Sequence, residues 1–260
     1  MNEVVQVGNA KLQRYEELLL KKDSLIKESF QYQMSYIKEF GDLIAECFNA
    51  KIACIEKKKI IAFCQKIINK GGKPSQADID RYIEDTMKDY YQELKDMLAR
   101  NAESKKGTAI SEYTKRKIKN IYYRIAKLIH PDTNPSLAND EKAKELWNRV
   151  VVAYECNQLK DIEELEVLVN QYLESINYKG NTLEIPDLDE KIFNLNEEIE
   201  KIINTDPYQY KYLLSDFDAV EEKKNEIKNE KEDYVKYGEE LDKVIAEFNI
   251  ERMLAWVRMN

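Results

Sequence analysis

The chain has 260 residues, of which 43% are hydrophobic and 35% are charged, and its formal net charge is −8. It contains no run of the roughly 20 apolar residues that a membrane-spanning helix needs. Its first residues lack the basic and then apolar order of a signal peptide. These features argue against a membrane protein and predict a cytoplasmic one.

Helix-breaking residues are scarce, with 7 glycines and 5 prolines in the whole chain. This scarcity predicts long helices and an all-α fold. We expect three consecutive segments: a long helical hairpin over 1–104, a central helical region over 105–178 and a C-terminal coiled-coil segment over 179–260.

The N-terminal segment has an apolar residue at eight of nine positions spaced by seven. These positions are Leu12, Leu19, Ile26, Gln33, Phe40, Cys47, Cys54, Ile61 and Ile68. Such a repeat is typical of a coiled-coil-like helix. Gly71 or Gly72 fits the end of that helix and Ser75 fits the start of another, so we expect the chain to return over about 76–102.

The C-terminal segment contains three helix-start signals, at Asp187, at Asp206-Pro207 and at Ser215-Asp216. The helix after Asp216 has a second sevenfold seam, formed by Val220, Ile227, Tyr234, Leu241 and Phe248. That seam needs a partner. The N-terminal hairpin is the simplest partner, and a second copy of the chain in a homodimer is the alternative.

The four cysteines form no Cys-x-x-Cys pair, and the single histidine is not at metal-ligand spacing from them. We therefore predict reduced, structural thiols, no metal and no cofactor.

The central region contains a basic helix in an otherwise acidic protein. Residues 113–129 hold six basic residues and no acid, whereas 181–250 hold 20 acidic and 9 basic residues. The helix is followed by the only histidine of the chain, in the sequence His130-Pro131-Asp132, and by a further helix over about 140–157. This order of basic helix, His-Pro-Asp loop and helix resembles the J domain of DnaJ-type co-chaperones.

The resemblance implies a docking role on a DnaK-type ATPase chaperone, whose ATP hydrolysis the J domain accelerates. His130, Pro131 and Asp132 would form the contact, and a basic helix face would steer the partner. That face comprises Lys115, Arg116, Lys119, Arg124 and Lys127. The helix pair would be held together by Tyr122, Ile125, Ala126, Trp147, Val150 and Tyr154. A client protein is a further expected partner, and the resemblance favours a bacterial source.

Two of the departures from the J-domain pattern bear on docking. The tyrosine signature of the first J helix lies too far upstream, at Tyr91, so we expect the return helix over 76–102 to take that place. The residue after Tyr122 is normally basic and is Tyr123 here. The departures keep open a scaffold protein that retains the fold without stimulating a chaperone.

Two other classes of protein fit the sequence less well. An enzyme is not expected, because His130 has no nucleophile motif, phosphate-binding loop or second histidine to act with. Nucleic-acid binding through the basic helix is disfavoured, because the acidic remainder of the chain would repel phosphates.

Overall fold

The structure is a computed structural model that describes residues 2–106, 110–178 and 187–248, and these residues form helices and connecting turns. In chain order the helices are α1 (Asn2–Ile68), α2 (Gln76–Lys106), α3 (Glu112–Ile129), α4 (Glu141–Glu155), α5 (Leu159–Ser175), α6 (Leu188–Ile203), α7 (Tyr210–Ser215) and α8 (Phe217–Glu247). The prediction of an all-α fold is confirmed. None of the described helices combines the length and the apolar character that crossing a membrane requires.

The chain divides into two compact units that each combine distant segments. Unit 1 joins Met1–Gln31 with Thr108–Gln209, and unit 2 joins Tyr32–Gly107 with Tyr210–Asn260. Helix α1 contributes residues to both units. The units therefore do not coincide with the three consecutive segments, whose status as domains stays a prediction.

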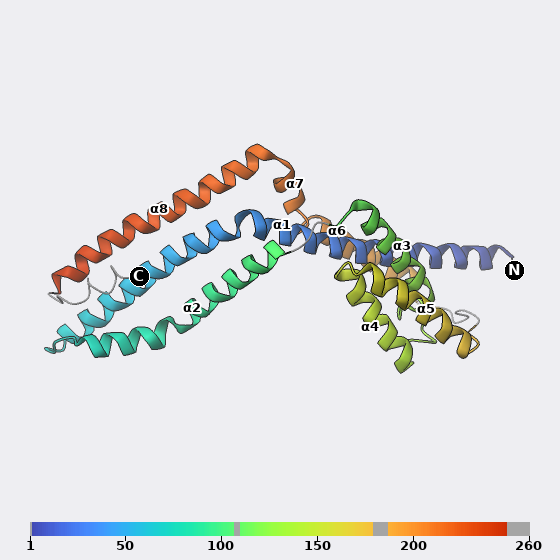
Figure 1. The fold of residues 1–260 in the computed structure, drawn as a ribbon, viewed down its shortest axis with the longest axis horizontal. Helices are drawn as coiled ribbons and strands as arrows, with labels where there is room; N and C mark the ends of the chain where they lie inside the picture. Colours follow the sequence, from blue (N-terminus) through green and yellow to red (C-terminus); the bar gives the residue numbers. More distant parts are fainter. Residues whose placement is uncertain (1, 107–109, 179–186, 249–260) are drawn as a thin grey trace. The chain divides into compact units, whose positions relative to one another are not determined.

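In unit 2, helices α8, α1 and α2 run side by side with α1 in the middle (Figure 1). Ile52 and Cys64 of α1 are buried in one cluster with Met87 of α2. Phe40 of α1 is buried in another cluster with Ile227 of α8. Two apolar faces of α1 thus have partners within the chain. The expected return of the C-terminal helix onto the N-terminal hairpin is confirmed.

Polar contacts from side chains of α1 fix α8 against it. Lys57 Nζ of α1 donates hydrogen bonds to the Gly238 carbonyl oxygen, at 3.0 Å, and to Asp242 Oδ2, at 2.7 Å. The Cys54 thiol donates to the Tyr234 carbonyl oxygen at 3.0 Å. These contacts pair the two sevenfold seams at a defined register.

Three of the cysteines are buried, namely Cys47, Cys54 and Cys64, whereas Cys156 is exposed at the end of α4. All four are free thiols. Burial raises the pKa of the three buried thiols, so they are protonated and unreactive near neutral pH. The predicted reduced, structural state fits this environment.

The predicted helix starts have mixed outcomes. Asp216 begins α8 as expected, because its Oδ1 accepts hydrogen bonds from the amides of Asp218 and Ala219. The start at Asp187 is confirmed, because α6 begins at Leu188 with Asp187 as its N-cap. The expected capping box is absent, since Asp187 has a left-handed backbone with φ of 54° and makes no capping hydrogen bond through its side chain. The start at Pro207 was wrong, because the helix begins later, at Tyr210.

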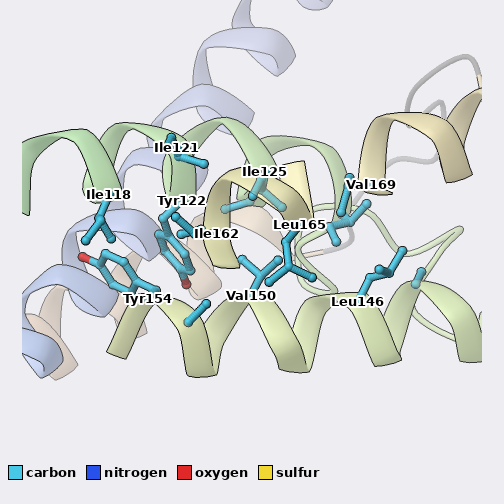
Figure 2. Close-up of a cluster of buried hydrophobic side chains, with 14 of the residues drawn as sticks. Ile118, Ile121, Tyr122, Ile125, Leu146, Val150, Tyr154, Ile162, Leu165 and Val169 are labelled. Atoms are coloured by element: carbon cyan, nitrogen blue, oxygen red, sulfur yellow. The ribbon is translucent and has the colours of Figure 1, made fainter. Parts of the chain in front are cut away.

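In unit 1, helices α3, α4 and α5 pack around one apolar cluster (Figure 2). Helix α5 contributes Ile162, Leu165 and Val169, all of them buried, and lies against both α3 and α4. Leu20 of α1 is buried in the same cluster. The N-terminal part of α1 is therefore a component of this core.

Candidate functional site

The His-Pro-Asp sequence lies where α3 ends and the chain reverses. His130 is the C-cap residue of α3, and its amide donates a hydrogen bond to the Ala126 carbonyl oxygen. Its φ of −60° and ψ of 127° are extended, as expected for a residue before proline. The His130 carbonyl oxygen then accepts hydrogen bonds from the amides of Thr133, at 3.2 Å, and Asn134, at 2.9 Å. Proline and these bonds make the loop a tight turn.

The His130 imidazole is held on two sides. Its Nδ1 accepts a hydrogen bond from the Asp132 amide at 3.1 Å, and its ring meets the Trp147 ring edge-on with centroids 4.7 Å apart. Burial lowers the pKa of His130, against the opposing effect of Asp23 and Asp132. The imidazole is therefore a neutral, oriented group. Asp132 beside it is exposed, so its carboxylate is accessible to a partner.

A buried polar network stabilises the turn behind His130. Asn134 is only 4% exposed, and its Nδ2 donates to Thr133 Oγ1 at 3.0 Å and to the His130 carbonyl oxygen at 3.3 Å. The Tyr178 hydroxyl, from beyond α5, donates to Asn134 Oδ1 at 3.1 Å. The sequence reasoning missed these three residues. Asn134 carries a signal, since an asparagine just after a turn often bonds to the backbone, whereas Tyr178 carries none.

The six predicted core residues lie in one cluster between α3 and α4. Tyr122, Ile125, Ala126, Val150 and Tyr154 are buried, and Trp147 is partly buried against them. The Tyr122 and Tyr154 rings stack at 3.9 Å between centroids. Tyr122 meets residue 154, whereas His130 meets residue 147, so the two helices are antiparallel.

The predicted basic residues are spread over the surface of α3 and have different neighbours. Arg124 makes a two-point contact with Glu166 of α5, with Nε–Oε1 at 2.6 Å and Nη2–Oε2 at 3.0 Å. Lys115 pairs with Glu112 at 2.8 Å, and Lys119 lies 5.5 Å from the Tyr123 ring centroid. Arg116 and Lys127 are exposed. The structure therefore does not give these five residues one common exposed face.

The first segment of α1 lies across α3 and α4 beside the turn. Asp23 Oδ2 accepts a hydrogen bond from the Tyr122 hydroxyl at 2.8 Å, and Ser24 Oγ lies 2.6 Å from the Tyr123 hydroxyl. Lys27 Nζ donates to the Tyr154 carbonyl oxygen at 2.6 Å. The sequence reasoning treated this segment only as part of a coiled coil, and nothing in its heptad pattern indicates these polar contacts.

The contacts with α1 change the titration of the groups involved. Burial raises the pKa of Asp23, although the hydrogen bond from the Tyr122 hydroxyl, the charge of His130 when it is protonated and the charge of Lys22 oppose the change. Burial and the neighbouring Lys115 and Lys119 lower the pKa of Lys27 to about 8. Two charged groups are thus partly desolvated at this contact, which offsets part of its stability.

The third helix of the bundle is α5 and not the return helix. The expectation for residues 76–102 was wrong on this point, because α2 belongs to unit 2 and its apolar face, with Ile79, Ile83 and Met87, is buried there. Helix α5 covers both α3 and α4 instead.

The described residues contain no group of three or more side chains that could hold a metal ion. The chain matches no protein-family model, no curated protein and no solved structure.

Proposed function

We propose that this protein is a J-domain-like co-chaperone that docks on a DnaK-type ATPase chaperone and stimulates its ATP hydrolysis. The observation that carries the proposal is the tight turn between two antiparallel helices, in which His130 is oriented and Asp132 is exposed. A rigid turn of this kind offers side chains to a partner with little further loss of conformational entropy.

The chemistry of the turn suits a single arginine on the partner, within a surface that is otherwise acidic and so attracts the basic side chains of α3. The Asp132 carboxylate can accept a two-point hydrogen bond from an arginine, which is the strongest contact available to it. Pro131 and the neutral His130 ring would shield that pair from water. Exposed Arg116 and Lys127 would act mainly on the rate of association and on its salt dependence.

The test is single-turnover ATP hydrolysis by the chaperone with and without this protein. We expect the wild type to accelerate hydrolysis, and Asp132→Asn to remove the acceleration while leaving the fold intact, because residue 132 is exposed. Asp233→Asn is the matched control, since Asp233 is an exposed aspartate of α8 in unit 2. His130→Gln is a second test of the same turn. Equal acceleration by all four proteins would contradict the proposal.

A helical scaffold without chaperone stimulation is the second candidate function. It is favoured by the pairing of Arg124 with Glu166 and by the position of α1 beside His130, both of which occupy groups that a chaperone would use. No acceleration by any variant would favour this scaffold role.

A further inference from the structure

Side chains that lead to the histidine form one stripe along α3. Lys119, Tyr123, Lys127 and His130 follow each other at helical spacings of four, four and three residues, so they share a side of the helix. We call these residues the histidine stripe. Any partner that binds both His130 and the helix before it must approach along this stripe.

Helix α1 already lies on the histidine stripe. The Tyr123 hydroxyl bonds to Ser24 Oγ, at 2.6 Å, and lies 3.2 Å from the Leu20 carbonyl oxygen. Next to His130, residues Glu16, Leu19 and Leu20 of α1 face the turn across a small recess. Leu19 and Leu20 are buried, and His130 itself is only partly exposed.

From these contacts we infer that residues 15–27 of α1 form an autoinhibitory strap, which occupies the chaperone-docking stripe and must be displaced before a partner can reach His130. The inference rests on the proposed docking function. It concerns regulation of the same site, and it makes the strap a direct competitor of the partner.

The composition of the contact permits such a displacement. Residues 15–27 bury Tyr15 and four leucines, and they also make polar contacts through Asp23, Ser24 and Lys27. On release, water can take the place of the partners in these polar contacts. The recess beside His130 leaves the strap imperfectly packed at that end. Burial of the Asp23 and Lys27 charges adds a cost that release would remove.

The strap predicts a specific order of activity among variants. Leu20→Ala combined with Ser24→Ala removes apolar contact and the Tyr123 hydrogen bond but keeps residues that favour helix. If docking needs the released state, the apparent affinity equals the intrinsic affinity multiplied by the fraction of molecules in which the strap is released. We expect the double variant to reach half-maximal stimulation of the chaperone at about a tenfold lower concentration than the wild type.

The matched control is Glu17→Ala combined with Lys21→Ala, which places two alanines at the same spacing on the exposed side of the same helix. It should behave as the wild type does. Circular dichroism checks that both double variants keep their helix content.

A second readout does not depend on the chaperone. His130 is the only histidine, so the absorbance of the carbethoxyimidazole that forms with diethyl pyrocarbonate reports on this ring alone. The strap variant should react several-fold faster than the wild type and the control. An equal rate in all three proteins would overturn the strap.

The outcomes separate the strap from the docking function. Equal stimulation by wild type and strap variant overturns the strap and leaves docking intact. Faster carbethoxylation without stimulation by any variant means that the strap covers His130 but that the proposed docking function fails. Faster carbethoxylation together with stronger stimulation in the strap variant supports both the strap and the docking function. In Asp132→Asn only the stimulation should then be lost.

Discussion

The Tyr122 hydroxyl donates a hydrogen bond of 2.8 Å to Asp23 Oδ2, although the two residues are 99 positions apart in the chain. This bond links α1 to the core of the helix pair that bears the His130 turn. Asp23 is partly buried, which raises the pKa of its carboxyl group. The bond therefore compensates a charge that has lost part of its hydration.

Tyr122→Phe should lower the free energy of unfolding by about 1–3 kcal/mol, because it leaves the Asp23 carboxylate without this donor. Urea unfolding followed by circular dichroism measures the change. Tyr113→Phe is the control, since Tyr113 is on the same helix and is 77% exposed. A double-mutant cycle with Asp23→Asn isolates the coupling, and a coupling of zero would contradict the role of the bond.

Titration of His130 should give a pKa below the usual 6.5, because burial disfavours the imidazolium. Proton NMR of the single histidine measures it directly. In Asp23→Asn the pKa should fall further, since the carboxylate of Asp23 favours the charged ring. A pKa above 6.5 in the wild type would show that the nearby acids outweigh burial.

The same shift predicts how stability depends on pH. Above about pH 6.5 the His130 ring is neutral in the folded and in the unfolded state, so it contributes no pH dependence. Below that pH the unfolded chain binds the proton first, so the free energy of unfolding falls. Asp23 acts in the opposite direction at lower pH, because its raised pKa lets the folded state bind a proton first. The loss that begins near pH 6.5 should therefore be smaller in His130→Gln, as measured by urea unfolding across pH 5–8.

The turn should loosen when its polar network is cut. Asn134→Ala removes a buried amide that bonds to Thr133 and to the His130 carbonyl oxygen, and we expect a loss of about 1–3 kcal/mol. Tyr178→Phe removes the bond to Asn134 and a longer one, of 3.5 Å, with the exposed Ser136, and it should cost less, about 0.5–1.5 kcal/mol. Hydrogen exchange of the Thr133 and Asn134 amides should accelerate in both. Asn139→Ala, at an exposed position of the same loop, should leave the exchange unchanged.

Two helical glycines of unit 2 should respond oppositely to alanine. A Cβ at Gly238 would lie 3.4 Å from Lys57 Nζ and 3.6 Å from Cys54 Sγ, which is ordinary contact. Gly238→Ala should therefore stabilise α8 by about 0.5–1 kcal/mol.

A Cβ at Gly41 would lie 2.8 Å from Cγ of Asn101, a residue that is only 4% exposed. Gly41→Ala should therefore destabilise the protein by about 1–3 kcal/mol, because the buried amide must move. Thermal unfolding of the two variants compares them directly. A stabilising effect at Gly41 would show that Asn101 moves without cost.

Local patterns in the sequence were sufficient for the helices and for several of their ends. Scarce glycine and proline predicted the long helices, and Asp216 was recognised as the start of α8 from its own side chain. The side-chain spacing also placed Tyr122, Ile125 and Val150 in one core. Asp187 was recognised as the start of α6, but the absence of a side-chain cap was not foreseen, because the sequence did not indicate its left-handed backbone.

The sequence by itself determined the helices, the turn at His130 and the residues of the α3–α4 core, because each depends on neighbours within a few positions or on one helical period. Only the tertiary structure decided which helices cover that core. The Asp23–Tyr122 and Arg124–Glu166 contacts, together with α5 in place of the return helix, join residues that no short pattern connects. An apolar helix face predicts that the face is buried. It does not predict which helix covers it, because apolar burial is not directional.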